Sequence, residues 1–449
     1  MTFTSDRSFY KSMLSISLPI ATQNLITFAI SVSDTMMLGK LGEVSLSSSA
    51  IGNNVFFILA VIIFGVGSAS SVMGAQYYGK KDIDSIHKVM SIMYRICIIL
   101  AIIFTIISFT FSRQLISIFT NDTLVITEGS KYLRIISLGY ILYSITSCTI
   151  TIFRSVKTIR ISLVVYSFGL VCNLFLNWMF IFGKFGVPRL GVPGAAVATL
   201  ISRVVEISVI LIFMFRFDKK IKFKIKYLKS IDKLIIKDFI KISTPIILNE
   251  MCGSIGSSMI CIIVARMGTM VVAANSINNM VNQFATLFMY GLASASSVII
   301  GNTIGEGNTN KVKEYANTIA LLSVFMGILA AIIIYILRPI AINFYNVADV
   351  TKDIAREIMV ATAIVSIFRS LSANILTGIL RGGGDNKFVF IVEMICLWCV
   401  SIPLGFIGSF VWKLPIVVVF LIIRSDEVLK SIIGLIRLAS GKWINDITR

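Results

Sequence analysis

The second half of this chain repeats its first half at an offset of 226 residues. The run SASSV occurs at Ser68–Val72 and again at Ser294–Val298, and Gly79 corresponds to Gly305. The same offset pairs Pro19 with Pro245 and Gly42 with Gly268, and an offset of 227 pairs Arg154 with Arg381. Both halves are strongly apolar. The duplication is therefore typical of a two-lobed membrane transporter whose substrate path lies between the lobes.

The chain is too apolar to cover itself with polar groups as a soluble protein does. Of its 449 residues, 56% are hydrophobic and only 14% are charged, and the mean hydropathy is +0.90. A helix needs ~20 apolar residues to cross a bilayer. Twelve such stretches occur, at 14–38, 52–76, 89–111, 133–153, 161–183, 194–216, 242–264, 277–300, 316–337, 357–380, 388–411 and 415–438. The sequence thus predicts an all-α membrane protein with two parallel six-helix repeats.

A lysine-rich segment separates the halves. Residues 218–241 hold nine lysines and three aspartates, and basic residues alternate with apolar ones. We expect an N-terminal lobe of helices 1–6 (1–217), a basic linker (218–241) along the cytoplasmic membrane surface, and a C-terminal lobe of helices 7–12 (242–449).

The net charge of +19 does not indicate a nucleic-acid partner, because the excess lies in loops on one predicted side. By the positive-inside rule, both termini and the linker are cytoplasmic, in a multi-pass plasma-membrane protein. The basic face suits anionic lipid headgroups. The first apolar stretch is too long and too polar for a cleaved signal peptide, so it is expected to be the first transmembrane helix.

The sequence has none of the residue patterns that catalytic sites commonly use. His87 is the only histidine, which excludes Ser-His and Cys-His catalytic pairs, and no phosphate-binding loop is present. The cysteines all fall in apolar stretches, and the CxxC of Cys396 and Cys399 has no accompanying ligands for a metal. We expect no catalysis, no cofactor, no ATP use and a monomer.

Ionisable residues at membrane depth are expensive and indicate function. Asp34 lies in the outer half of the first predicted helix. Asn173 and Asn177 share one face of the fifth, and Thr199 opens the sixth on the same side. An acid with amide and hydroxyl oxygens around it can hold a proton or Na⁺. The alternative is a helix-packing network.

The second half has a carboxylate at a different position. Glu250 is the repeat mate of Asn24, whereas the mate of Asp34 is Ile260. We expect Glu250 to face the central cavity and to bind a cationic substrate or a coupling ion. A Na⁺ site is therefore possible either at Asp34 or at Glu250. The alternative is a buried pair with an arginine, for which Arg369 is the candidate.

The other predicted sites are less specific. The prolines Pro19 and Pro245 are candidate hinges. Substrate-cavity candidates, each with lipid-facing or core packing as the alternative, are Gln23, Phe57, Asn249, Glu250, Met280, Gln283 and Phe284. Charges expected to pair within their own helices are Arg203 with Glu206, Asp426 with Lys430, and Glu427 with Lys430. Arg424 belongs to the same cluster, which is interpreted as structural.

Several short motifs, taken together and in order, resemble the multidrug and toxic compound extrusion (MATE) transporters over nearly the whole chain. They are DTMMLGKLG at Asp34–Gly42, GVPRLGVPGAAVAT at Gly186–Thr199, the turns GKKD at Gly79–Asp82 and GEGN at Gly305–Asn308, ILRGGGD at Ile379–Asp385, and SGKW at Ser440–Trp443.

This resemblance implies two lobes in a V, and exchange of H⁺ or Na⁺ for amphipathic, often cationic drugs. Asp34 matches the family's first-helix aspartate, and Glu250 matches a seventh-helix glutamate of some members. One branch has a tenth-helix aspartate where this chain has Arg369 and its neighbours, which favours a site centred on Asp34. The rival within the superfamily is a lipid-linked oligosaccharide flippase, whose cations would be Arg95, Arg203 and Arg369.

Overall fold

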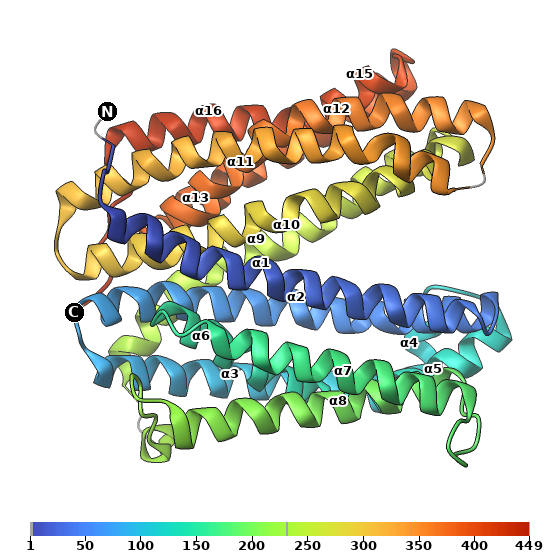
Figure 1. Cartoon of the computed structure of the whole chain (residues 1–449), viewed down its shortest axis with the longest axis horizontal. Coiled ribbons are helices and arrows are strands. Elements are labelled where there is room, and N and C mark those ends of the chain that lie inside the picture. Colours follow the sequence, from blue (N-terminus) through green and yellow to red (C-terminus); the bar gives the residue numbers. More distant parts are fainter. Residues whose placement is uncertain (1–2, 230–231, 346, 449) are drawn as a thin grey trace. The chain divides into compact units, whose positions relative to one another are not determined.

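The computed structural model of the chain describes residues 3–229, 232–345 and 347–448, and all regular elements in these ranges are helical (Figure 1). The elements of the first half are α1 (Arg7–Gly39), α2 (Glu43–Gly79), α3 (Ile83–Thr110), α4 (Ser112–Ser117), α5 (Thr123–Ser137), α6 (Tyr140–Ser155), α7 (Arg160–Phe182), α8 (Val192–Ile212), the π-helix η1 (Phe213–Phe217) and the 3₁₀-helix η2 (Ile225–Lys229).

The second half is built in the same way, with longer helices and more π-helical turns. Its elements are α9 (Lys233–Arg266), α10 (Thr269–Gly305), α11 (Thr309–Phe344), α12 (Asp349–Ala373), η3 (Asn374–Leu380), α13 (Asn386–Met394), η4 (Ile395–Ser401), α14 (Ile402–Phe406), η5 (Ile407–Val411), α15 (Ile416–Ile423) and α16 (Ser425–Ser440). The elements η3, η4 and η5 are π-helical and continue the helices around them.

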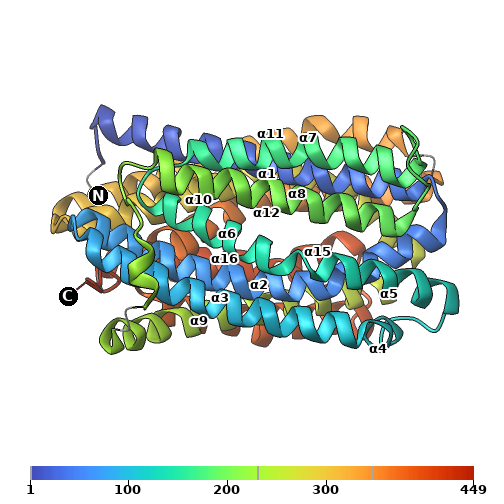
Figure 2. The same ribbon diagram turned by 90° about the horizontal axis from the view of Figure 1, so that it is seen from below.

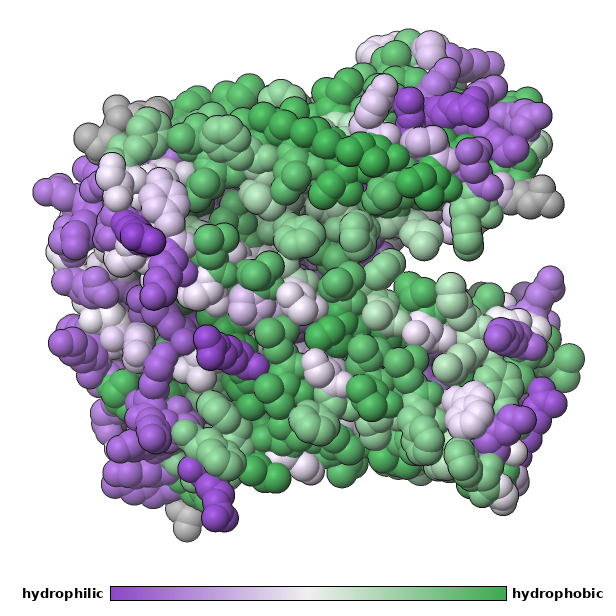
Figure 3. All heavy atoms as spheres, viewed as in Figure 1, coloured by the Kyte–Doolittle hydropathy of each residue, from purple (hydrophilic) through white to green (hydrophobic). Residues whose placement is uncertain are grey.

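Within the described residues, ten helices are long and apolar enough to cross a membrane. An eleventh span results if α5 and α6 count as one, because they are bent by 50° at a short break. The predicted stretch 133–153 therefore comprises the end of α5 and most of α6. The predicted twelfth, 415–438, is interrupted at Arg424 between α15 and α16, where charged residues lower its hydropathy. Figure 3 shows apolar side chains over the middle of the helices and polar ones towards their ends.

The chain divides into two compact units. Unit 1 comprises Met1–Ala21, Ala75–Lys81 and Thr244–Arg449, and unit 2 comprises Thr22–Gly74 and Asp82–Ser243. The predicted lobes, 1–217 and 242–449, differ from these units mainly in segments 1–21 and 75–81, and they stay a prediction. Unit boundaries fall inside α1, α2 and α9, so three long helices carry the chain from one unit to the other.

In unit 2, α7 and α8 run side by side (Figure 1 and Figure 2). Gly194 of α8 lies so close to α7 that a Cβ there would be 2.8 Å from the Phe180 carbonyl oxygen. This close approach follows the rule that small residues bring membrane helices together. The close approach sets the spacing of α7, which carries Asn173 and Asn177, and α8, which carries Thr199.

The duplication is visible at the starts of α3 and α11. Asp82 accepts a hydrogen bond from the Ser85 N–H at 3.0 Å, and its repeat mate Asn308 accepts one from the Lys311 N–H at 3.2 Å. Both are N-cap bonds, which satisfy amide groups that a helix leaves unpaired at its first turn. The predicted turns GKKD and GEGN are thus equivalent helix starts.

The repeated SASSV motif packs a helix within its own bundle, as predicted. In unit 1, a Cβ on Gly378 would lie 3.0 Å from Ser296 Cβ, and one on Gly382 would lie 2.7 Å from the Ser297 carbonyl oxygen. In unit 2, a Cβ on Gly74, just after the first copy, would lie 2.7 Å from Ser155 Oγ. Small residues at these positions let the helices approach closely.

The lysine-rich segment is only partly a linker. Its last nine residues, 233–241, are the first turns of α9. The part before them is held against α3, since His87 Nε2 bonds the Ile221 carbonyl at 2.8 Å, Arg95 donates to the Leu228 carbonyl, and Lys88 pairs with Asp232 at 3.2 Å. Residues 230–231 lie outside the described ranges. The prediction that the segment lies along the membrane surface stays a prediction.

Candidate functional site

The structure brings four predicted residues of unit 2 into one hydrogen-bonded chain. Asn177 Nδ2 donates to Asp34 Oδ1 at 2.5 Å and to Asn173 Oδ1 at 3.0 Å. Asn173 Nδ2 in turn donates to Thr199 Oγ1 at 3.4 Å. These side chains come from α1, α7 and α8, so the chain links three membrane helices. We call it the Asp34 network.

The Asp34 network is largely buried, but two of its side chains are partly exposed and one of its oxygen atoms has no hydrogen-bond partner among the described residues. Asn173 and Asn177 are buried, whereas Asp34 and Thr199 are half-buried. The Asn177 Oδ1 atom is buried and has no hydrogen-bond partner among the described residues. An ionised carboxylate, two amide oxygens and a hydroxyl are hard oxygen ligands, and the same groups can accept or relay a proton. The arrangement can therefore hold either predicted coupling ion.

Two further groups around the Asp34 network were not predicted. Tyr132 of α5 donates a hydrogen bond to Asn53 Oδ1 of α2 at 3.1 Å, and its ring lies within electrostatic range of Asp34. Arg203 of α8 also acts on the charge of Asp34. No spacing along the chain predicts these contacts, because the residues come from separate helices.

The predicted pair of Arg203 and Glu206 is present. The Arg203 Nη1 atom lies 2.7 Å from Glu206 Oε2, and the guanidinium lies 5.0 Å from the centre of the Tyr143 ring. Glu206 is buried, and Gly169 of α7 leaves the space that it occupies. Since its charge is matched by this carboxylate, Arg203 is not an open cation for an anionic ligand.

The partner of Glu250 is Arg381, so the prediction of Arg369 was wrong. Arg381 Nη1 lies 2.9 Å from Glu250 Oε1, and the arginine side chain is 5% exposed against 25% for the glutamate. Arg381 and Glu250 are 131 positions apart along the chain, so no helical spacing predicts their pairing. Glu250 is thus joined to a structural cation, and its role in ion or substrate binding stays a prediction.

The same arrangement occurs at the repeat-related position of unit 2. Arg154, the mate of Arg381, donates from Nη2 to Gln23 Oε1 at 3.3 Å. Gln23 is the mate of Asn249, one residue before Glu250. In each half, an arginine from the end of the fourth helix of the repeat therefore bonds the first helix of the same repeat. The carboxylate is present in unit 1 only.

The predicted substrate-cavity residues are not gathered in one place by any contact among the described residues. Gln23 and Asn249 are buried, and Gln23 is held by Arg154. Phe57 is 58% exposed, and the α10 residues Met280, Gln283 and Phe284 are also exposed. Lipid-facing positions would give the same exposure, so their role in substrate binding stays a prediction.

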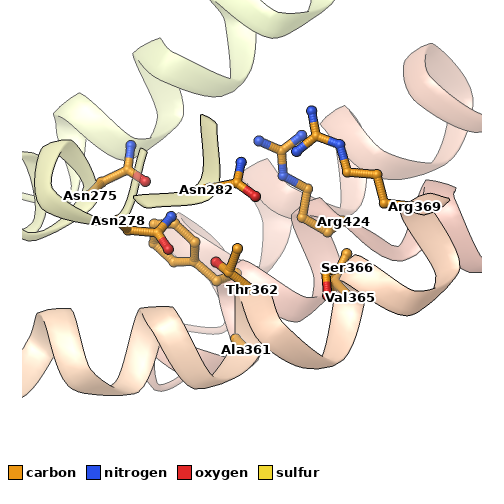
Figure 4. Close-up of a pocket in the computed structure, with 10 residues that line it drawn as sticks. Asn275, Asn278, Asn282, Ala361, Thr362, Val365, Ser366, Arg369 and Arg424 are labelled. Atoms are coloured by element: carbon orange, nitrogen blue, oxygen red, sulfur yellow. The ribbon is translucent and has the colours of Figure 1, made fainter. Parts of the chain in front are cut away.

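A cavity of unit 1 is lined by other residues. Asn275, Asn278 and Asn282 of α10 face Arg369 of α12 and Arg424 beside α15 across it (Figure 4). The asparagines are spaced three and four residues apart, which places them on one helix face and could have been read from the sequence. Of the predicted charge pairs nearby, Asp426–Lys430 is present at 2.7 Å. Glu427 accepts a hydrogen bond from Ser372 at 2.5 Å, and its charge also interacts with that of Lys430, as expected, but beyond ion-pair distance.

The predicted hinges lie inside continuous helices. Pro19 is within α1 and Pro245 within α9. Pro19 lies two residues before the unit boundary at Ala21, and Pro245 directly follows the boundary at Thr244. A proline removes one helical hydrogen bond and weakens the helix locally. Their role as hinges stays a prediction, at positions where such a role is physically reasonable.

The MatE family model matches residues 19–179 and 245–407, which are equivalent stretches of the two halves. A protein of Thermotoga maritima named "Probable multidrug resistance protein NorM" is 24% identical over 435 residues, covering 96% of this chain and 93% of that protein. The family-model match includes Asp34, Asn173 and Asn177 of the Asp34 network, whereas Thr199 lies between its two stretches.

Solved structures share the fold at low sequence identity. One, described as the "Outward-facing conformation of a multidrug resistance MATE family transporter of the MOP superfamily", has a TM-score of 0.88 at 18% identity, covering 98% of this chain and 100% of that chain. A MOP superfamily transporter from Pyrococcus furiosus, whose title states a reverse polarity of the binding pocket and a different function, matches with the same TM-score, identity and coverage. These likenesses show the fold alone.

Proposed function

Since the chain belongs to the MatE family, we propose that it is a multidrug exporter of the plasma membrane, driven by exchange with H⁺ or Na⁺. On this proposal its substrates are small amphipathic compounds, often cationic, and the relatives' names support only the role in multidrug resistance. Both termini are cytoplasmic on this proposal, in accord with the positive-inside rule. Transport requires no ATP and no chemical change of the substrate.

The observation that carries this proposal is the Asp34 network. When the Asp34 carboxyl is ionised, it accepts the hydrogen bond from Asn177. When it is protonated, one oxygen becomes a donor that needs an acceptor of its own, and the other oxygen is a weaker acceptor for the Asn177 amide. Na⁺ would likewise compete for the oxygens that these bonds use. Either ion therefore changes the contacts that join α1, α7 and α8.

Such a rearrangement can drive alternating access. An ion shifts a conformational equilibrium only by its difference in affinity for the two states. On this proposal, drug binds with the transporter open to the cytoplasm, and ion binding at Asp34 favours the state that releases drug outside. The prolines near the unit boundaries would let α1 and α9 bend during the change.

Efflux from proteoliposomes tests the proposal. A fluorescent lipophilic cation is loaded, and either a pH gradient or a Na⁺ gradient is imposed. We expect one of the two gradients to drive transport in the wild type, and Asp34→Asn to abolish it without unfolding the protein. Asp353→Asn is the matched control, because Asp353 is an exposed carboxylate paired with Arg356. Full coupled efflux in Asp34→Asn would refute the role of Asp34.

The rival flippase function is less well supported. Of its three candidate cations, Arg95 bonds a linker carbonyl and Arg203 is matched by Glu206. Only Arg369 faces an open cavity. Failure of efflux under both gradients, together with transport of a lipid-linked oligosaccharide, would establish the flippase instead.

A further inference from the structure

The lysine-rich segment between the two halves presents its cations outward in the structure. We call residues 218–229 the basic strap, which runs from the end of η1 through η2 and contains six lysines and one aspartate. Ile221 and Phe223 are buried, whereas Lys222 and Lys224, which alternate with them, are exposed. The apolar side chains of the strap therefore face the protein, and the lysines face its surroundings.

Contacts within unit 2 hold the basic strap in this position. The Phe223 ring packs against the rings of His87 and Tyr94 of α3, at centre-to-centre distances of 5.8 and 5.9 Å. Lys220 Nζ donates a hydrogen bond to the Val156 carbonyl oxygen at 2.7 Å. Because apolar and polar contacts both anchor the strap, its outward lysines are held on the fold in one arrangement.

The acidic side chains near the basic strap are occupied by other partners. Asp218 accepts hydrogen bonds from three backbone N–H groups of the strap itself, at 3.1, 3.0 and 2.6 Å. Asp84 accepts one from the Tyr227 hydroxyl, and Asp232 pairs with Lys88. The exposed lysines of the strap that have no carboxylate within ion-pair distance among the described residues are Lys219, Lys222 and Lys224.

Exposed apolar side chains lie beside these lysines in the chain. Phe215 and Phe217 of η1 are 53% and 61% exposed, and Ile225 of η2 is 62% exposed. Phe217 is also the last residue of a candidate membrane span, Val192–Phe217. Exposed apolar side chains followed by lysines at the end of a span are typical of the boundary between acyl chains and headgroups. A nucleic acid would leave these apolar side chains uncovered.

We propose that the basic strap is a binding surface for anionic phospholipids. Its lysines reach headgroup phosphates through their flexible stems, and the charge of the lipid balances cations that have no carboxylate of their own. Phe215, Phe217 and Ile225 enter the adjacent acyl layer. The net charge of the chain predicts only a general attraction to anionic lipids, whereas the fold supplies a defined surface. This lipid binding does not depend on the proposed transport, its coupling ion or its drug.

Binding of two fluorescent lipids to the purified protein in a neutral detergent tests the proposal. Phosphatidylglycerol is anionic and phosphatidylcholine is zwitterionic, and the two probes carry the same acyl chains and the same dye. We expect the wild type to bind phosphatidylglycerol about tenfold more tightly, and sodium chloride to reduce this preference because salt screens exposed charges. The triple variant Lys219→Gln, Lys222→Gln and Lys224→Gln should lose most of the preference.

The matched control is the triple variant Lys40→Gln, Lys184→Gln and Lys413→Gln, which removes the same charge from exposed lysines of other loops. Its preference for phosphatidylglycerol should equal that of the wild type. Arginine at the three strap positions keeps the charge and should also keep the preference. This second variant distinguishes loss of the lipid surface from a failure to fold.

The apolar part of the surface is tested separately. Phe215→Ser combined with Phe217→Ser should weaken the binding of both lipids by about fivefold, because less apolar area is buried in the acyl layer. The preference for the anionic headgroup should remain. Unchanged affinity for both lipids in this variant would show that the two phenylalanines do not contact the acyl chains.

Two results overturn the lipid surface: equal affinity of the wild type for the two lipids, or a preference that the strap glutamine variant retains. A single-stranded DNA oligonucleotide that binds the wild type as tightly as phosphatidylglycerol, and does not bind the strap glutamine variant, would also refute it and make nucleic acid the partner. Because these measurements report lipid binding, a failure of drug efflux under both gradients would leave their outcome unchanged.

Discussion

Asp34 and Glu250 are both carboxylates in membrane helices, but the partner of Asp34 is neutral and the partner of Glu250 is charged. Asp34 is held by a neutral amide that can turn or release it. Glu250 is held by the guanidinium of Arg381, which cannot lose its charge. A group that must bind and release an ion needs the first kind of partner. At the residue scale, Asp34 is therefore the better candidate for the proposed coupling role.

Breaking the Glu250–Arg381 pair should destabilise the fold. Glu250→Gln leaves the buried Arg381 charge without its carboxylate, and we expect a loss of about 3 kcal/mol in unfolding free energy. Adding Arg381→Met should recover most of that loss. The measurement is thermal unfolding in detergent.

The matched control for this pair is Glu357→Gln, on an exposed position of α12. It should change the unfolding free energy little. If Glu250→Gln is as stable as this control but loses coupled efflux, Glu250 is an ion site and the structural interpretation fails.

Contacts within one helix of the candidate sites were predictable from the sequence, whereas contacts between helices were not. Asn173 and Asn177 are four residues apart on one helix, so their shared face was predictable from the sequence. Arg381 and Tyr132 reach their partners from other helices, and no local spacing encodes such contacts. The interruption of the twelfth span at Arg424 was visible as a charge cluster, but the cavity beside it was not.

At the scale of helices, the ends of α2 and α10 cross within unit 1 at two glycines. A Cβ on Gly79 would lie 2.0 Å from the Asn302 carbonyl oxygen, and one on Gly305 would lie 1.9 Å from the Gln76 carbonyl oxygen. Both obstacles are backbone atoms, which cannot move without separating the helices. The repeat places these glycines at equivalent positions, so the crossing is a consequence of the duplication.

Gly305→Ala should therefore lower the unfolding free energy by about 2 kcal/mol, as overpacking does. Gly39→Ala is the matched control. Gly39 is also the last residue of its helix, but a Cβ there meets no atom within 4 Å. Equal unfolding midpoints of the two variants in detergent would contradict the crossing.

The start of α9 depends on Asp232. Its carboxylate accepts hydrogen bonds from the N–H groups of Leu234 and Ile235 and pairs with Lys88. The bond from Ile235 and the pairing with Lys88 lower the pKa of Asp232. A lowered pKa means that this stabilisation is complete above the ordinary value of about 4 and is lost as the pH falls through the folded-state value.

Trypsin cleavage within the lysine-rich segment measures this docking. Asp232→Ala removes both the cap and the ion pair and should speed cleavage at neutral pH. Asp232→Asn keeps a cap-forming side chain and loses only the charge, so its effect should be smaller. Equal rates for both variants and the wild type would show that Asp232 does not anchor the segment.

At the scale of the whole molecule, the duplication made most of the fold predictable. It predicted that the two halves have corresponding membrane helices, equivalent turns and equivalent packing motifs. It could not indicate where the halves differ, namely the carboxylate at Asp34 in one half and the paired glutamate and the two-arginine cavity in the other. The proposed function depends on those differences, because it assigns the coupling ion to one specific site.

We propose that ion binding at Asp34 drives release of the drug, and equilibrium displacement tests this most directly. A fluorescent lipophilic cation is bound to the purified protein, and release is followed as the pH is lowered or Na⁺ is added. We predict that one of these ions displaces the dye from the wild type and from Asp353→Asn, but not from Asp34→Asn. Equal displacement from the Asp34→Asn variant would contradict the account.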